Sequence, residues 1–250
     1  MMWRVSSGAV MLLVMATVAL AQAPTDFMVR HTHYFVICND TDTAPTISVQ
    51  SRGVYTYPDA LKLRVIDDQS EVRMQRVVAL DGSLEQQIPG PAAPLYLVIA
   101  EPGMNGVIFG CDRPWGIMAS GSYGLGSSGK VPPLHLYVPP ECESFTIKAQ
   151  ATSPGEGLRL VVQQPDGAEA LVMDGEFDAA EEHKVEVPAP ARGEVWALTL
   201  SDPQTADARL DDIQLWVDGY LAPLLWPSQE WAEVEGPKVW LRQKAVLDQQ

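Results

Sequence analysis

The amino-acid sequence predicts an all-β protein made of two antiparallel β-sandwich domains in tandem. Short apolar-rich segments recur along the chain at the spacing of roughly 8–12 residues that is typical of such sandwiches. The stretches between them are rich in proline, glycine and aspartate, which favour turns. The 250 residues include 20 prolines and 19 glycines, and no long amphipathic helical pattern is present.

The clearest strand pattern lies between residues 134 and 218. Within it, the Pro-Asp-Gly sequence at 165–167 predicts a hairpin turn, because proline fixes φ at the first turn position and glycine accepts positive φ. Trp196, Leu198 and Leu200 alternate along one segment and are expected on one buried face, with Trp196 as the largest core residue. The seven predicted strands lie in LHLYVPP, FTIKAQA, LRLVVQQ, EALVMDGEF, HKVEVPA, EVWALTL and DIQLWVDGY.

Residues 22–130 are predicted to form an immunoglobulin-like sandwich of seven or eight strands. The first strand is expected to be continuous over residues 28–38 (MVRHTHYFVIC), so that His31 and His33 would share one face. Asp81-Gly82 predicts a tight hairpin, since both residues tolerate positive φ. The other candidate strands are residues 46–50, 54–57, 61–66, 71–80, 95–100 and 106–111.

The sequence GSYGLGSSGK at 121–130, followed by Val-Pro-Pro, predicts a flexible connection between domains. We therefore expect an N-terminal sandwich over 22–130 and a C-terminal sandwich over 131–222. The alternative is a long loop within one larger sandwich. Residues 223–250 form a tail that contains proline and tryptophan and is expected to be partly helical or docked, with Trp226 and Trp231 packed on a sandwich.

Residues 1–21 predict a secretory signal peptide. Arg4 is the only charge before Asp26, an apolar run follows it, and the Ala-Leu-Ala sequence at 19–21 fits a cleavage site. The apolar run is too short for a comfortable membrane span, although a retained membrane anchor is the alternative. We expect a secreted or periplasmic protein with no membrane span after cleavage.

The charge of the chain excludes one class of partner. The sequence has 17 basic and 32 acidic residues, a net charge of −15, and most of the excess lies after residue 130. Such a surface repels nucleic acid phosphates, so no nucleic-acid role is expected. The acidic turns at 174–178 and 207–212 could ligate Ca²⁺, but solvated turns are the simpler interpretation, and no other cofactor is expected.

The three cysteines are an odd number for an oxidising compartment. Cys38 and Cys111 each end an apolar strand of the same predicted domain, and two strand ends of one sandwich can approach within disulfide distance. We therefore expect a Cys38–Cys111 disulfide, with Cys142 as a free or intermolecular thiol. The alternative is three reduced, buried cysteines.

The block from 134 to 222 resembles an accessory β-sandwich of exported bacterial proteins. The likeness rests on LHLYVPPECESFTI, GLRLVVQQPDG, the Val-Glu-Val-Pro of 185–188, Val-Trp-Ala-Leu at 195–198 and DIQLWVDGYLAP. The block is also similar in kind to pre-peptidase C-terminal domains and to jelly-roll-like carbohydrate-binding modules. This resemblance implies an accessory role beside secreted enzymes and transfers no catalytic residue.

One loop combines the residue types that bind sugars. Asp112, Arg113 and Trp115 lie close together in the sequence, with Tyr123 nearby. A sugar ring can stack on an aromatic plane while aspartate and arginine bond its hydroxyls, so these four residues are the candidate ligand-binding set. The alternative for Trp115 is a core or interface position. The His31-Thr32-His33 pair is a weaker metal candidate, because it lacks the spacing of known copper sites.

No catalytic motif accompanies these residues. The sequence has no G-x-S-x-G elbow, and no cysteine–histidine pair looks activated. We therefore expect an exported, non-catalytic binding or accessory module for a polysaccharide or a cell-envelope component. The alternatives are a small secreted polysaccharide hydrolase, since carboxylates are plentiful, and a structural or interaction subunit of an envelope complex.

Overall fold

The computed structural model describes residues 27–122, 124–151 and 153–247. The predicted signal peptide, residues 1–21, lies outside the described residues. Within them the chain is mostly β-structure, arranged as two large antiparallel sheets. The predicted all-β antiparallel sandwich is confirmed, and so are the seven strands expected between residues 134 and 218.

The smaller sheet, sheet A, has eight strands in the described residues. Their spatial order is β15 (Glu181–Glu186), β12 (Ser144–Ala151), β17 (Ile213–Gly219), β10 (Leu125–Ser127), β1 (Met28–Arg30), β8 (Gly106–Cys111), β3 (Thr46–Arg52) and β6 (Ser83–Gln87).

The larger sheet, sheet B, has ten strands in the same described ranges. Their order is β14 (Glu169–Gly175), β13 (Leu158–Gln163), β16 (Glu194–Ser201), β11 (Leu134–Val138), β18 (Leu224–Trp226), β9 (Trp115–Met118), β2 (His33–Cys38), β7 (Leu95–Glu101), β4 (Leu61–Asp67) and β5 (Val72–Val78). The short 3₁₀ helix η1 (Ala189–Ala191) and the α-helix α1 (Gln229–Leu247) complete the fold.

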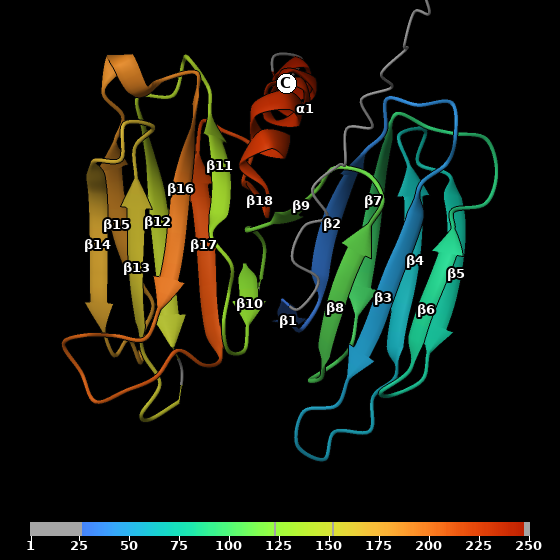
Figure 1. The fold of residues 1–250 in the computed structure, drawn as a ribbon, viewed down its shortest axis with the longest axis horizontal. Helices are drawn as coiled ribbons and strands as arrows, with labels where there is room; N and C mark the ends of the chain where they lie inside the picture. The colour runs from blue at the N-terminus through green and yellow to red at the C-terminus, as the bar shows by residue number, and fades with distance from the viewer. Residues whose placement is uncertain (1–26, 123, 152, 248–250) are drawn as a thin grey trace, which may run out of the picture.

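Both sheets run without a break through the two halves of the molecule. In sheet A, β10 pairs with β1 on one side and with β17 on the other. In sheet B, β18 pairs with β9 and with β11. The halves therefore lie side by side and are joined by backbone hydrogen bonds, with α1 above the junction (Figure 1). Strand β10 lies within the segment that the sequence predicted as a flexible connection; the domain boundary near residue 130 stays a prediction.

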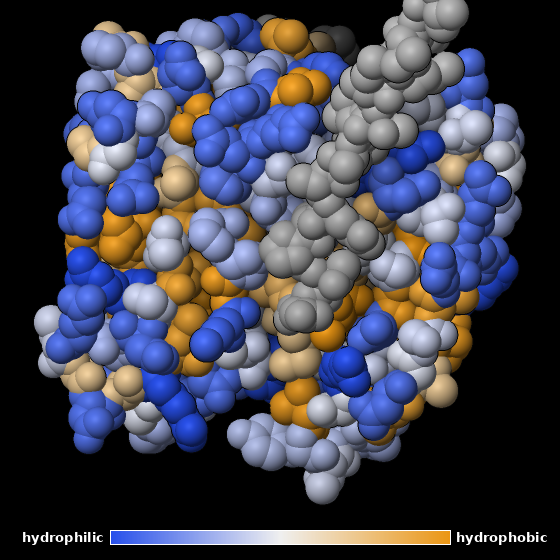
Figure 2. Space-filling model, viewed as in Figure 1, coloured by the Kyte–Doolittle hydropathy of each residue, from blue (hydrophilic) through white to orange (hydrophobic). Residues whose placement is uncertain are grey.

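The core lies between the sheets and extends through both halves. Trp196 is completely buried, as predicted, and its indole Nε1 donates a hydrogen bond to the carbonyl oxygen of Ala191. The ring of Phe145 packs edge-on against it at 5.5 Å. On the visible face, hydrophobic residues lie mostly in a band across the middle of the strands, with hydrophilic residues above and below (Figure 2). This distribution follows from sheets that pack through their centres and end in polar turns.

Three local predictions in the N-terminal half were wrong. Residues 28–38 form two strands, because His31 has a positive φ of 68° and the chain crosses there from sheet A to sheet B. Residues 54–57, predicted as a strand, lie in a loop. Asp81-Gly82 does turn the chain, with φ of 56° at Asp81, but it joins strands of different sheets and closes no hairpin. The predicted turn at 165–167 is confirmed, since β13 and β14 pair directly across it.

The C-terminal tail docks on the sandwich through its tryptophans. Trp226 and Trp231 are buried, as predicted, and Trp240 packs edge-on against Tyr220. The oxygen of Ser228 accepts a hydrogen bond from the backbone N–H of Trp231, so this serine caps α1, the helical part of the tail. No helix in the described part of the chain has the length and apolar character required to cross a membrane.

Helix α1 approaches the sheet closely because residue 236 is glycine. A Cβ atom at Gly236 would lie 2.5 Å from Cβ of Tyr137 on β11. We therefore expect Gly236→Ala to lower the free energy of unfolding by about 1–3 kcal/mol through overpacking, although alanine is the better helix former. Urea denaturation of this variant and of Val234→Ala, whose side chain is exposed, provides the comparison. Equal stability of the two variants would contradict this account of docking.

Candidate functional site

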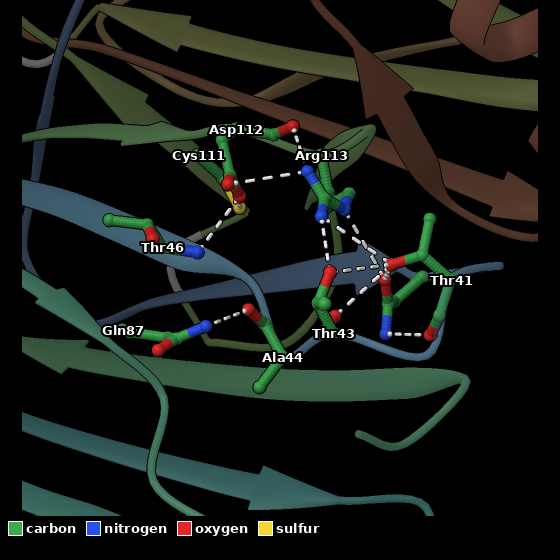
Figure 3. A network of polar contacts seen from close by, with 9 residues as sticks. Thr41, Thr43, Ala44, Thr46, Gln87, Cys111, Asp112 and Arg113 are labelled. Atoms are coloured by element: carbon green, nitrogen blue, oxygen red, sulfur yellow. Dashed lines mark hydrogen bonds and ion pairs between the residues drawn. The ribbon is translucent and has the colours of Figure 1, made fainter. Parts of the chain in front are cut away.

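The loop predicted to bind sugar holds a neighbouring turn in place. The Asp112 carboxylate accepts a hydrogen bond from the backbone N–H of Thr46 at 2.8 Å. The Arg113 guanidinium donates to Asn39 Oδ1 at 3.3 Å and to Thr43 Oγ1 at 3.0 Å, and it lies 3.2 Å from Asp112 Oδ2 (Figure 3). The charged groups of Asp112 and Arg113 therefore already have hydrogen-bond and ion-pair partners within the chain.

Trp115 lies in the core. Its side chain is 2% exposed, and its ring packs against Phe35, Phe109 and Trp231 at centroid distances of 5.8, 5.1 and 6.4 Å. The indole therefore has no free face on which a sugar could stack. The prediction that Trp115 binds sugar is wrong, and the alternative, a core position, is what the structure shows. Tyr123, the fourth residue of the predicted set, lies outside the described residues.

The burial of Trp115 predicts its effect on stability. We expect Trp115→Ala to lower the free energy of unfolding by about 3–5 kcal/mol, because the substitution leaves a cavity between both sheets and α1. Tyr34→Ala, at a partly exposed aromatic position, is the control, and urea denaturation measures both. A loss below about 1 kcal/mol for Trp115→Ala would show that the indole is not part of the core.

The two histidines of the predicted pair take separate roles. His33 is buried on β2, its Nε2 accepts a hydrogen bond from the backbone N–H of Gly126 at 3.0 Å, and its Nδ1 lies 3.2 Å from the carbonyl oxygen of His31. The ring thus ties β2 to β10 as a neutral imidazole. His31 occupies the crossing between sheets. Among residues 27–122, 124–151 and 153–247, no group of three or more His, Cys, Asp or Glu side chains is placed to hold a metal ion.

Burial lowers the pKa of His33 from 6.5 to about 4. Below pH 6.5 the unfolded chain takes up a proton that the folded chain does not, so stability falls as the pH drops from 6.5 to about 4. We expect wild type to lose on the order of 3 kcal/mol more than His33→Gln over this window, as followed by urea denaturation at each pH. A His33→Gln variant with an unchanged pH dependence would contradict the assignment.

The predicted Cys38–Cys111 disulfide is absent, and all three cysteines are free. The two strand ends belong to different sheets, since Cys38 ends β2 in sheet B and Cys111 ends β8 in sheet A. Phe35 on β2 stacks on a core ring, so Cys38, three residues later, points to the outer face and lies beneath Glu235 of α1. Burial raises the pKa of both the Cys38 and Cys111 thiols to about 12, which makes them poor nucleophiles.

Carboxylates of the two acidic turns form hydrogen bonds and an ion pair with other groups of the chain. Asp174 Oδ1 accepts hydrogen bonds from the backbone N–H groups of Gln204 and Thr205, and its Oδ2 pairs with Arg159 at 2.7 Å. Asp211 accepts a bond from the hydroxyl of Ser128 at 2.5 Å. These carboxylates have a structural use.

A different loop, over residues predicted from the sequence to form a strand, presents exposed aromatic rings. Tyr55 and Tyr57, in the connection between β3 and β4, are 87% and 37% exposed. Their rings meet edge-to-face, with centroids 6.5 Å apart. We call residues 53–59 the tyrosine loop. Exposed aromatic side chains of this size are costly to leave in water and commonly mark binding surfaces.

The tyrosine loop is held rigidly from below by one buried side chain. Asn105, fully buried after β7, accepts a hydrogen bond from the backbone N–H of Val54 at 2.9 Å. Its amide nitrogen donates to the carbonyl oxygens of Tyr57 and Asp59 at 3.1 and 2.9 Å. At the start of the loop, the N–H of Gly53 donates to Asp81 at 2.8 Å. The backbone of the loop is therefore fixed before any ligand binds.

The backbone at Tyr55 is also strained. Its φ is 51°, in the left-handed region that glycine and asparagine adopt more readily than a bulky residue. Such a conformation costs roughly 1–3 kcal/mol and persists where the surroundings impose it, often at functional sites. Because the Tyr55 side chain is almost fully exposed, its packing does not offset this cost. The retained strain therefore points to a use for the ring outside the chain.

No protein-family model matches the chain, and no curated protein is similar to it in sequence. The resemblance of residues 134–222 to accessory sandwiches stays a prediction. The candidate site is accordingly defined by geometry, and only the Val-Tyr-Thr-Tyr-Pro sequence at 54–58, two tyrosines before a proline, could have indicated it from the sequence.

Proposed function

We propose that the protein is an exported, non-catalytic binding module that holds a neutral polysaccharide on the tyrosine loop. The observation that carries this proposal is the exposed pair Tyr55 and Tyr57 on a backbone fixed by the buried Asn105. A fixed loop loses little conformational entropy on binding, and tyrosine provides a large rigid surface with few rotatable bonds.

The chemistry of the loop suits a sugar polymer. The apolar face of a pyranose ring can stack on a tyrosine ring, and its hydroxyls can bond polar groups at the edge. Thr56 and Asp59, both exposed, supply such groups beside the two rings. The net charge of −15 disfavours an anionic polymer, so a neutral chain is the better ligand.

The test measures retention of the purified protein on insoluble neutral polysaccharides, cellulose and chitin, with assay of released soluble sugar for the hydrolase alternative. We expect wild type to bind at least one of them without releasing sugar. Tyr55→Asn keeps a residue that tolerates the left-handed backbone but removes the ring, and it should weaken binding by about 1–3 kcal/mol while the melting temperature is unchanged or slightly raised.

Tyr34→Ala, at an exposed tyrosine on β2 away from the loop, is the matched control and should bind as wild type. Asn105→Ala should weaken binding and stability together, because it removes three hydrogen bonds of a buried amide. Binding by Tyr55→Asn at wild-type strength would refute the proposed site. Release of soluble sugar would favour the hydrolase.

A further inference from the structure

A hollow on the outer face of sheet A lies close to the tyrosine loop. It has a volume of about 170 Å³ and spans β8, β3 and β6, at one end of the sheet. The hollow is present because Ser48 on β3 has a small side chain and Gly110, its partner on β8, has none. The outward-facing residues that line it are Ser48, Gln50, Ser83, Glu85, Ile108 and Gly110.

The hollow and the tyrosine loop share one stretch of backbone. Gly53, the first residue of the loop, follows β3 directly and lies three residues after Gln50. Since a strand rises about 3.3 Å per residue, the hollow begins roughly 10 Å from the loop. The backbone N–H of Ser51 donates to the carbonyl oxygen of Gly82 at 2.9 Å, and that of Gly53 donates to Asp81 at 2.8 Å. These bonds fix the start of the loop to the start of β6, which forms one side of the hollow.

Polar side chains around the hollow have hydrogen-bonding capacity that the described part of the chain does not use. The hydroxyls of Ser48 and Ser83 and the carboxylate of Glu85 have no hydrogen-bond or ion-pair partner within the described residues. The Oε1 atom of Gln50 accepts a hydrogen bond from the Arg52 guanidinium at 2.9 Å, which leaves the amide N–H groups of Gln50 for another acceptor. The hollow therefore offers donors and acceptors together. Sugar hydroxyls need both, because each hydroxyl can donate and accept.

The hollow also has an apolar side. Ile108 is partly exposed between Gln50 on β3 and Met28 on β1, so its side chain can contact the apolar face of a sugar ring. Within the described residues, Glu85 is the one charged side chain that lines the hollow. A carboxylate repels an anionic polymer, and so does a net charge of −15. The lining therefore favours a neutral sugar chain.

We propose that this hollow is a second sugar subsite, which binds further sugars of the same neutral polysaccharide chain that stacks on Tyr55 and Tyr57. The inference rests on the proposed function, because it treats the hollow as the continuation of the tyrosine loop. When two linked parts of one ligand bind two subsites, the second contact is intramolecular and the affinity rises. The gain disappears when the ligand is too short to span both subsites.

Isothermal titration calorimetry with soluble oligosaccharides of cellulose and chitin of increasing length tests the proposal. We expect the association constant of wild type to rise about tenfold or more between the shortest oligosaccharide that binds and those long enough to reach the hollow. The double variant Gln50→Ala with Glu85→Ala removes two hydrogen-bonding side chains and should abolish most of this rise. Short oligosaccharides should bind to it as to wild type. Both side chains are exposed, so the melting temperature should not change.

Glu182→Ala is the matched control, at an exposed glutamate on the outer face of sheet A in the other half of the molecule. It should keep the wild-type dependence on length. The wild-type dependence in the double variant would overturn the second subsite and leave the tyrosine loop as the whole site.

Tyr55→Asn separates this inference from the proposed function. It should weaken the binding of oligosaccharides of every length, because the tyrosine loop is used by all of them. Wild-type binding by Tyr55→Asn, together with weak binding by the double variant, would refute the tyrosine loop and retain the hollow. A wild-type chain that binds no oligosaccharide of either kind would overturn both.

Discussion

The junction between the two halves is the constraint on which the rest of the structure depends. Sheet A passes through it by the pairing of β1 with β10, and sheet B by the pairing of β9 with β18. The chain crosses between these sheets at His31, and the buried His33 ring reaches back across the crossing to the backbone of Gly126. Because the chain crosses at this point, residues 28–38 supply a strand next to the junction to each sheet, β1 to sheet A and β2 to sheet B.

Arg30 connects this junction to the proposed binding surface. Its buried guanidinium pairs with Asp212 of the C-terminal half at 2.5 Å and donates to the carbonyl oxygen of Met104 at 3.1 Å. Met104 precedes Asn105, the residue that fixes the tyrosine loop. The position of the loop thus depends on contacts from both halves, although its residues all lie in the first. Removing one partner of a buried ion pair costs several kcal/mol, roughly 3–5, so this contact holds the two halves together strongly.

Much of the fold could be predicted from the sequence, because alternating apolar residues between turn-forming residues report directly which side of a strand is buried. The predictions hold best from residue 134 to 218, where Trp196 and the Pro-Asp-Gly turn at 165–167 act within a few residues of the chain. They fail where two sheets compete for the same segment. The pattern MVRHTHYFVIC is apolar enough for one strand, and no local preference reveals that the chain changes sheets at His31.

The candidate site was harder to predict for the same reason. Asp112, Arg113 and Trp115 have the residue types of a sugar site, but tertiary packing places the indole in the core and uses the two charges within the chain. Cys38 and Cys111 both end strands, yet the face and the sheet on which each lies depend on long-range pairing. The tyrosine loop was not predicted, because tyrosines such as Tyr55 and Tyr57 favour strands. The side chain that holds these residues in a loop is Asn105, about fifty residues later in the sequence.

We propose that residues 53–59 form a binding surface whose backbone is held in the same conformation with and without ligand. The most direct measurement is an NMR titration of the backbone amides with soluble oligosaccharides of cellulose and chitin. We expect the largest chemical-shift changes at residues 53–59 and at the side-chain amide of Asn105, with the junction amides unaffected. Changes centred instead on Asp112 and Arg113, or none in the tyrosine loop, would contradict it.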